Sequence, residues 1–381
     1  DLNNFYASVE QTLNPELKGK YIAVSGNPLA RSGIILAKNT AAKQMGVQTG
    51  EPIWQAKQKC PELVCVLPHF EYYVHFSKRV REIYERYTDR VEGFGLDECW
   101  LDVTHSKIFG TPFEIAEKIR AEVKRETGLT ISVGVSFTKT FAKLGSDLKK
   151  PDATTVISRD NYREVVWKLP VADMLLIGKR TAAKLNEMGI YTLGDLANGS
   201  VVALKKRFGI VGERLYKSAR GEDEDEVRNA SAEREIKSVS HGTTALRDMI
   251  TYADADKVIF YLSDMVATRL RRYGYIGDVV HLYIRYNDLT HEGKQHKIKA
   301  TNVCDDIYRT ASKLLRDIWK GKADKPLRSL TVSVAGLYEV YLGAQTSLFD
   351  VIDGKDEQLE YSIDRIRKKY GFNAIRRASI L

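Results

Sequence analysis

The sequence predicts an α+β protein built from several domains. Strand-like and helix-like segments alternate along its 381 residues, and 43% of these residues are hydrophobic, which is enough for about two to four packed cores. In the segment from about 91 to 135, strand, helix and strand follow one another with antiparallel neighbours expected. This order is typical of a ferredoxin-like α+β domain.

The first part of the chain mixes short strands with helices. The pattern predicts a strand over 21–25, a helix over 37–45 that ends at Gly46, and then elements whose order suggests the ferredoxin-like domain. These later elements are a helix over 75–87, a strand-like stretch over 91–104, a helix over 112–126 and a strand over 129–135.

The second part of the chain begins with a helical, mainly basic region over about 158–222. The acidic run 222–226 breaks this charge pattern, and we interpret it as a linker, although a solvated loop has the same composition. Beyond it, strands expected over 279–285 and 330–335 alternate with helices expected over 253–273 and 307–319. The tail has a helical pattern over 359–370.

Composition narrows the possible partners and the compartment. The 59 Lys and Arg residues outnumber the 50 Asp and Glu residues, and the formal net charge of +9 favours a polyanionic partner. No stretch reaches the roughly 18 apolar residues of a membrane span, and no signal peptide is visible. The four cysteines lack CxxC spacing, so we expect free thiols and a cytoplasmic protein.

Two adjacent carboxylates interrupt a strand-like apolar stretch. Asp97 and Glu98 lie within GFGLDECWLDV, and a third acidic residue, Asp1, opens the chain where a strand passes into a helix. Buried carboxylates need cations or strong donors, so this pattern indicates a site for two divalent ions. In a regular strand, neighbouring side chains point to opposite faces, so Asp97 and Glu98 require a bend. We expect Asp102 to be structural.

Five segments, in order, resemble the Y family of translesion DNA polymerases, and the bacterial DNA polymerase IV and V branches in particular. They are DLNNFYASVE, GIILAKNTAAKQMGVQTGEPIWQAK, GLDECWLDVT, SVGVSFTKTFAKLGSDLKKPD and QTSLFD. The resemblance implies a right-hand polymerase with a ferredoxin-like palm, small fingers, a helix-hairpin-helix thumb and an α/β little finger. The domain ranges it implies are 1–5 and 71–157 (palm), 6–70 (fingers), 158–222 (thumb), 223–233 (linker), 234–341 (little finger) and 342–381 (tail).

By this resemblance, Asp1, Asp97 and Glu98 are the catalytic metal ligands, together with the backbone carbonyl of Leu2, and they hold two Mg²⁺ ions. Deoxynucleoside triphosphates and primer-template DNA are the implied substrates. Tyr6 matches the position of the ring that excludes a 2′-hydroxyl, and Phe5, next to it, is also expected at the nucleotide-binding site. Core packing is the alternative interpretation of this aromatic pair.

Three further residues match positions that grip the triphosphate: Thr40, Lys43 and Lys150. The family usually has Tyr and Arg at the first two positions, so this chain departs from it there. Lys43 retains the charge but lacks the planar, bidentate guanidinium group, and Thr40 offers one hydroxyl in place of a phenol.

Two more motifs imply macromolecular partners. The turn with Gly178 and Lys179 resembles a helix-hairpin-helix that holds a DNA phosphate, and Gly212 belongs to a weaker second match. The tail peptide 345–349 resembles a motif that binds the bacterial sliding clamp. Its contact residues are expected to be Gln345, Ser347, Leu348 and Phe349. We expect a monomer with no membrane contact.

Two rival interpretations predict other functions. A nucleotide cyclase could share the palm, but it would need neither a basic thumb nor a clamp peptide. An inactive clamp- and DNA-binding subunit would be consistent with the departures at Thr40 and Lys43, but not with three retained carboxylates. Primer extension separates these possibilities.

Overall fold

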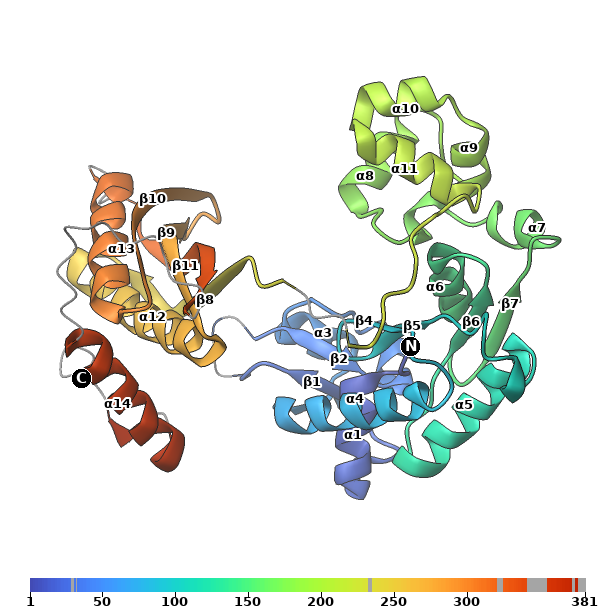
Figure 1. The fold of residues 1–381 in the computed structure, drawn as a ribbon, viewed down its shortest axis with the longest axis horizontal. Coiled ribbons are helices and arrows are strands. Elements are labelled where there is room, and N and C mark those ends of the chain that lie inside the picture. Colours follow the sequence, from blue (N-terminus) through green and yellow to red (C-terminus); the bar gives the residue numbers. More distant parts are fainter. Residues whose placement is uncertain are drawn as a thin grey trace. The chain divides into compact units, whose positions relative to one another are not determined.

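The computed structural model divides the chain into two compact units (Figure 1). The first consists of Asp1–Pro28 and Gly33–Ala232, and the second of Leu29–Ser32 and Glu233–Leu381. The structure describes residues 1–28, 31, 33–231, 235–320, 325–340, 355–371 and 374–375, without the side chains of 355–357. Each unit is described by itself below.

The first unit contains short strands and mostly short helices. Its described strands are β1 (Ile22–Ser25), β2 (Ile35–Lys38), β3 (Val64–Val66), β4 (Val91–Phe94), β5 (Glu98–Leu101), β6 (Val133–Ser136) and β7 (Thr154–Ile157). Its described α-helices are α1 (Phe5–Leu13), α2 (Thr40–Gln44), α3 (Ile53–Lys59), α4 (Phe70–Glu85), α5 (Pro112–Thr127), α6 (Lys139–Leu148), α7 (Tyr162–Val166), α8 (Lys179–Asn186), α9 (Leu193–Asn198), α10 (Val201–Phe208) and α11 (Ile210–Ala219).

Strand pairing in this unit groups the elements into three small sheets. One sheet has the order β2-β1-β3, while β4 pairs antiparallel with β5, and β6 pairs parallel with β7. Leu2 forms an isolated antiparallel bridge with Ile131, which lies two residues before the start of β6. The start of the chain is therefore held between the β4–β5 hairpin and β6, as the next section describes.

Three hydrophobic cores support the first unit. The first includes Phe5 and Val9 of α1 with residues of α4 and α5, the second lies under β1–β3, and the third joins α6 to the helices α8–α11. The helices α8–α11 form a cluster of their own in Figure 1. Because α1 shares its core with α4 and α5, the predicted boundary between palm and fingers at residue 5 passes next to a packed helix. The six domain ranges stay predictions.

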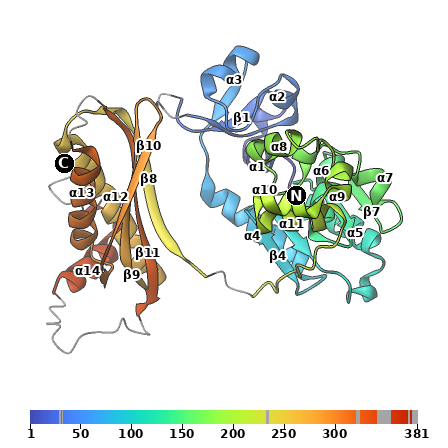
Figure 2. The same cartoon turned by 90° about the horizontal axis from the view of Figure 1, so that it is seen from above.

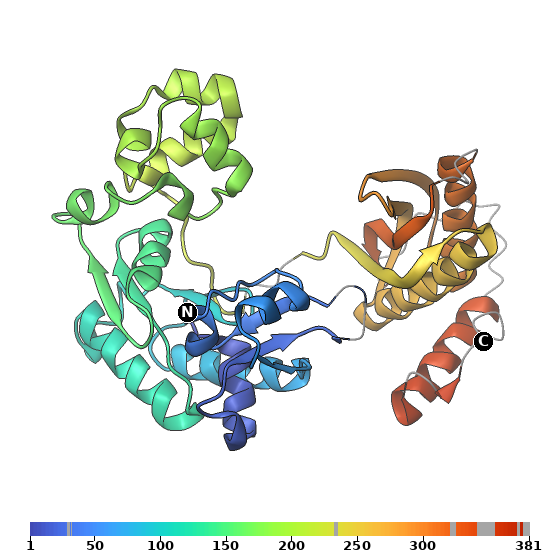
Figure 3. The same cartoon turned by 180° about the vertical axis from the view of Figure 1, so that it is seen from behind.

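The second unit is a four-stranded antiparallel sheet covered by two helices on one face (Figure 2). The strand order is β10-β9-β11-β8, and β9 pairs with β11 through Val280↔Val334 and Leu282↔Val332. Its elements are β8 (Ser238–Met249), α12 (Tyr252–Tyr273), β9 (Tyr275–Tyr286), β10 (His291–Thr301), α13 (Cys304–Trp319), β11 (Leu327–Glu339) and α14 (Lys355–Tyr370). The red helix in Figure 3 is α14, which contacts α12.

Local sequence signals explain several helix ends. For example, Thr111 and Glu114 form a reciprocal capping box at the start of α5, and Gly128 ends that helix with a φ of 71°. Several expected boundaries are wrong; for example, the strand expected over 129–135 is β6 (Val133–Ser136). Residues 37–38 belong to β2 rather than to a helix, because Asn39 caps α2 through its side chain, and α4 begins at Phe70 rather than at 75.

Two expectations from composition are also met by the described residues. All four cysteines are free thiols. None of the described helices combines the length and the apolar character that crossing a bilayer requires.

Candidate active site

The bend that Asp97 and Glu98 require is the turn of the β4–β5 hairpin. Phe94 pairs with Glu98, so Asp97 lies in the turn and Glu98 is the first residue of β5. Gly95 has a φ of 83°, a left-handed conformation that glycine adopts without steric cost. The turn therefore separates the two carboxylates from the regular strand alternation, as the sequence predicted.

Two side chains of helix α4 hold this turn in place by hydrogen bonds to its backbone carbonyls. The Ser77 hydroxyl donates a hydrogen bond of 2.5 Å to the Leu96 carbonyl, and Arg81 Nη2 donates one of 2.6 Å to the Gly95 carbonyl. A Cβ atom at Gly93 would lie 2.8 Å from Arg81 Nη2, so the missing side chain makes room for the guanidinium. Neither supporting residue could be predicted from the sequence, because only the fold brings α4 against the turn.

The start of the chain lies beside the same turn. The Leu2 backbone N–H donates to the Asp97 carbonyl at 3.0 Å, and the Ser132 N–H donates to the Asp1 carbonyl at 2.9 Å. These bonds place Asp1 between the hairpin and the strand β6. The structure thus brings Asp1, Leu2, Asp97 and Glu98 together, although they are almost 100 residues apart in sequence.

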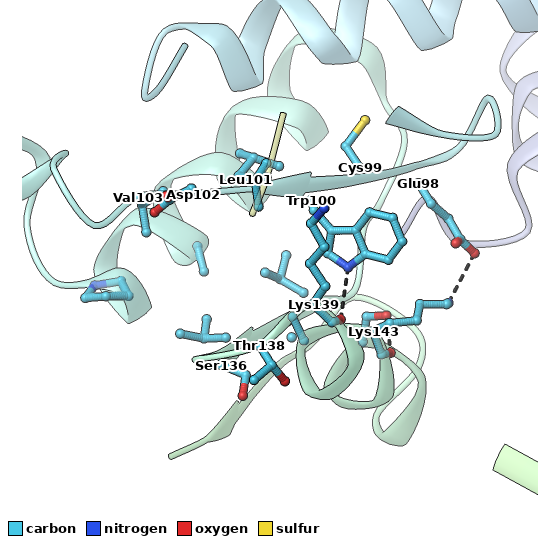
Figure 4. A pocket seen from close by; sticks show the side chains of 18 of the residues that line it. Glu98, Cys99, Trp100, Leu101, Asp102, Val103, Ser136, Thr138, Lys139 and Lys143 are labelled. Atoms are coloured by element: carbon cyan, nitrogen blue, oxygen red, sulfur yellow. Dashed lines mark hydrogen bonds and ion pairs between the residues drawn. The ribbon is translucent and has the colours of Figure 1, made fainter. Parts of the chain in front are cut away.

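Lysine side chains join two of the three carboxylates. Lys143 Nζ lies 2.8 Å from Asp1 Oδ2 and 3.1 Å from Glu98 Oε1, and Lys150 Nζ lies 2.9 Å from the same Asp1 oxygen. Figure 4 shows Lys143 reaching from its helix toward Glu98, in a cavity of about 360 Å³. The sequence predicted Lys150 at the site but missed Lys143.

The donor set fits a divalent cation in part. Glu98 Oε2 is buried and has no hydrogen-bond partner among the residues that the structure describes, which is unusual for a carboxylate oxygen. Asp1 is only 8% exposed and already attracts two ammonium groups. No three His, Cys, Asp or Glu side chains of the described chain form a ready metal cluster. Asp1 and Glu98 therefore both contact lysine ammonium groups, and the second oxygen of Glu98 is available to a further cation.

Tyr6 and Phe5 differ in their surroundings. Phe5 is buried at 3% exposure within the core, whereas Tyr6 is partly exposed and stacks on Tyr73, with ring centroids 4.2 Å apart. Burial raises the pKa of Tyr6, and the nearby charge of Asp97 raises it further. The structure thus sends the Phe5 ring into the core and leaves the Tyr6 ring close to Asp97.

A polar group beneath the stack fixes the second ring. The hydroxyl of Tyr73 donates to Glu10, whose carboxylate also lies 3.0 Å from His69 Nδ1. Glu10 is 3% exposed, so this carboxylate is buried among its partners. The Tyr6 ring therefore rests on a neighbour that cannot easily move.

The predicted triphosphate-gripping residues lie on different elements. Thr40 is the exposed first residue of α2, and its hydroxyl accepts a hydrogen bond of 3.0 Å from Asn4 Nδ2. Lys43 is exposed on the same helix. The bond to Asn4 links Thr40 to the segment that carries Asp1. Lys150 contacts Asp1 itself, as described above.

The thumb glycines have different roles. Gly178 caps the start of α8, just before Lys179, and has open space where a Cβ would be. Gly212 lies inside α11, where a Cβ would come 2.3 Å from the Leu204 carbonyl, so it permits close packing against α10. Leu176, at the position of the usual first hairpin glycine, has a φ of 72° and is 74% exposed. The predicted clamp-binding residues Gln345, Ser347, Leu348 and Phe349 lie outside the described residues.

Three family models match the chain. They are described as the impB/mucB/samB family (residues 1–147), the C-terminal domain of that family (residues 236–348) and the thumb domain of DNA polymerase-iota (residues 176–223). A protein named DNA polymerase IV from Acetivibrio thermocellus is 44% identical over 385 residues, which cover all of this chain and 96% of the relative. A DNA polymerase IV 2 from Halalkalibacterium halodurans is 36% identical over 99% of this chain and 93% of its own length.

Solved structures give the same result. A Y-family DNA polymerase chimera of Dbh and Dpo4 superposes with a TM-score of 0.79 at 27% identity, covering 89% of this chain and 98% of the chimera. An insertion ternary complex of Dbh DNA polymerase superposes with a TM-score of 0.59 at 26% identity, covering 89% and 98%.

Proposed function

This chain belongs to the Y family of DNA polymerases, in the DNA polymerase IV group, and on that premise we propose which of its side chains perform the reaction. It is a DNA-directed DNA polymerase that carries out translesion synthesis on primer-template DNA with deoxynucleoside triphosphates. The rival interpretation as an inactive binding subunit is not favoured by this kinship. Its polymerisation depends on a divalent metal.

The metal proposal is that Asp1, Asp97, Glu98 and the Leu2 carbonyl hold two Mg²⁺ ions. The observation that carries it is the gathering of Asp1 and Glu98 on shared positive charge, with the buried Glu98 Oε2 left without a partner among the described residues. When bound, such ions lower the pKa of the primer 3′-hydroxyl and neutralise the triphosphate. The chain itself orients these oxygens through the turn that Ser77 and Arg81 hold.

Nucleotide binding is assigned to side chains around these carboxylates. Lys150, Lys43 and Thr40 grip the triphosphate, with two point charges and one hydroxyl in place of a bidentate fork. The Tyr6 ring lies under the sugar and leaves no room for a 2′-hydroxyl, and its stacking on Tyr73 supports this role. Phe5, whose ring centroid lies 5.5 Å from that of Tyr6, belongs to the same nucleotide site and supports the Tyr6 ring from the core side.

Binding of DNA and of a partner protein is assigned to the outer parts of the chain. The N–H groups at the start of α8, next to Gly178 and Lys179, hold a DNA phosphate without reading sequence. The net charge of +9 provides the wider attraction. We further propose a monomer in the cytoplasm that binds the bacterial sliding clamp through residues 345–349.

The test is extension of a primed template across an abasic site with Mg²⁺, comparing the wild type with Glu98→Ala and Asp97→Ala. We expect incorporation to fall by more than about a hundredfold, because the metals serve the chemistry, while primer-template affinity stays within about a few-fold. Asp102→Asn is the control, because Asp102 accepts a structural hydrogen bond of 2.9 Å from the Thr104 N–H. Normal turnover by either alanine variant would exclude these residues as metal ligands.

A further inference from the structure

Asp147 shares two lysines with the proposed metal ligands. Lys143 Nζ lies 2.8 Å from Asp147 Oδ2 while it also contacts Asp1 and Glu98. Lys150 Nζ lies 2.8 Å from Asp147 Oδ1 while it also contacts Asp1. One carboxylate on the outer side of the site therefore uses a separate oxygen for each of two ammonium groups.

The exposed fractions of these side chains increase from Asp1 through Lys143 to Asp147. The Asp1 side chain is 8% exposed and Lys143 is 16% exposed, whereas Asp147 is 46% exposed. Lys143 and Asp147 are four residues apart on α6, so they lie on one face of that helix. The lysines thus stand between an inner pair of carboxylates and an outer one.

Ammonium groups and divalent ions compete for the same oxygens. A cation bound to Asp1 Oδ2 and Glu98 Oε1 would lie within a few ångströms of Lys143 Nζ, and like charges at such a distance repel strongly in a partly buried site. Lys143 and Lys150 must then give up their inner contacts. Asp147 is already bonded to both of them, so they can keep an anionic partner when they move outward.

We propose that Lys143 is a built-in counter-cation that exchanges with the divalent metal, and that Asp147 is the positioning residue that retains Lys143 and Lys150 when they leave Asp1 and Glu98. This inference rests on the metal site of the proposed function. It assigns roles to two residues, Lys143 and Asp147, that the metal and nucleotide assignments above do not use. It also explains how Lys150 becomes available for a triphosphate.

The experiment measures Mn²⁺ binding to the full chain, without DNA or nucleotide, by the electron paramagnetic resonance signal of free Mn²⁺. We expect Lys143→Met to tighten Mn²⁺ binding by at least fivefold, because the competing cation is gone. Lys139→Met is the matched control, since Lys139 precedes Lys143 by one turn on α6, has the same 16% exposure and bonds to Glu92 at 2.6 Å instead. It should change Mn²⁺ affinity by less than twofold.

The second arm tests Asp147. Asp147→Asn should weaken Mn²⁺ binding by at least threefold, because the lysines lose their outer partner and compete harder for Asp1 and Glu98. In the Lys143→Met background this effect should shrink by at least half, since the two residues act through one contact. An equal effect in both backgrounds would mean that Asp147 acts only through its long-range field, and would overturn the proposal.

The remaining outcomes separate this inference from the metal site itself. If the double variant Asp97→Asn, Glu98→Gln still binds Mn²⁺ like the wild type, the metal-site assignment is wrong. The proposed exchange between Lys143 and the metal is then wrong as well. If that double variant loses Mn²⁺ while Lys143→Met binds like the wild type or like Lys139→Met, the metal site stands and the exchange is overturned. Lys143→Gln repeats the comparison with a polar side chain if the Met variant does not fold.

Discussion

At the scale of single residues, the site depends on contacts that neutralise or orient charge. Burial acts to raise the pKa of Asp147, but the hydrogen bonds from Lys143 and Lys150 outweigh it and lower the pKa. Asp147 is therefore kept ionised beside the two lysines. The Tyr6 ring is oriented by packing and not by a charged partner. It stacks on Tyr73, whose hydroxyl donates a hydrogen bond to Glu10.

Replacement of Tyr6 by Ala should relax sugar selection. We expect the use of ribonucleotides to rise by about tenfold or more relative to deoxynucleotides, because the ring excludes the 2′-hydroxyl by its volume. Single-nucleotide incorporation with each sugar measures this ratio. Tyr6→Phe is the control, since it keeps the ring and should keep the selectivity. Unchanged selectivity in Tyr6→Ala would assign the ring to packing alone.

At the scale of elements, glycines decide how closely helices approach. Gly178 and Gly212 both looked like parts of DNA-binding hairpins in the sequence, yet their surroundings differ. Space is open around Gly178, whereas a Cβ at Gly212 would meet the backbone of α10 at 2.3 Å. Backbone atoms cannot move aside as a flexible side chain can, so Gly212 is needed for packing.

Gly212→Ala should therefore destabilise the helical cluster α8–α11. An overpacked contact costs about 1–3 kcal/mol, which thermal unfolding and protease resistance of this cluster can detect. Gly178→Ser is the control, because serine is also favoured at a helix N-cap and the space around Gly178 is open, so stability should stay unchanged within about 0.5 kcal/mol. If both variants are equally stable, the helices α10 and α11 do not pack as closely as described.

Buried ion pairs link the helix α14 to α12 within the second unit. Arg367 pairs with Asp264 at 2.8 Å, with side-chain exposures of 6% and 2%, and Arg271 pairs with Glu360 at 3.1 Å, with both side chains 1% exposed. Leu359 and Tyr370 on the same helix are exposed. Docking of this helix is thus sensitive to the loss of any one charged partner.

Arg367→Met should detach α14 from α12. Removal of one partner leaves Asp264 buried without its bidentate cation, at a cost of about 3–5 kcal/mol. Hydrogen exchange of the backbone amides in α14 measures the loss of docking. Arg365→Met, at an exposed position of the same helix, should retain protection. Equal exchange in the two variants would contradict a role for the buried pair.

At the scale of the whole molecule, the predicted functional residues are distributed unequally between two compact units. The first carries the carboxylates, the Tyr6 ring and the helical hairpins, and the second carries the four-stranded sheet with its two helices. The predicted clamp peptide follows β11 and precedes α14 in sequence.

Changing both Leu348 and Phe349 to Ala should remove stimulation by a bacterial sliding clamp. If each anchor contributes about 2 kcal/mol, clamp affinity falls by roughly a thousandfold. Basal extension of a short primed template should persist, and affinity titration beside primer extension measures both properties. Retained clamp affinity would contradict the motif, and loss of basal synthesis would place the tail within the polymerase body.

The family, the α+β class and the candidate site residues could all be predicted from the amino-acid sequence. Local signals sufficed for α5, where a capping box and a final glycine mark both ends, and they singled out the carboxylates Asp97 and Glu98 as a predicted cation site. The surroundings of these residues depend on tertiary contacts. Ser77 and Arg81 reach the β4–β5 turn from α4, Lys143 reaches Asp1 and Glu98 from α6, and Gly212 packs closely against α10. Each of these contacts joins residues that are far apart in sequence or depends on one specific close approach, and neither periodicity nor spacing encodes such distances.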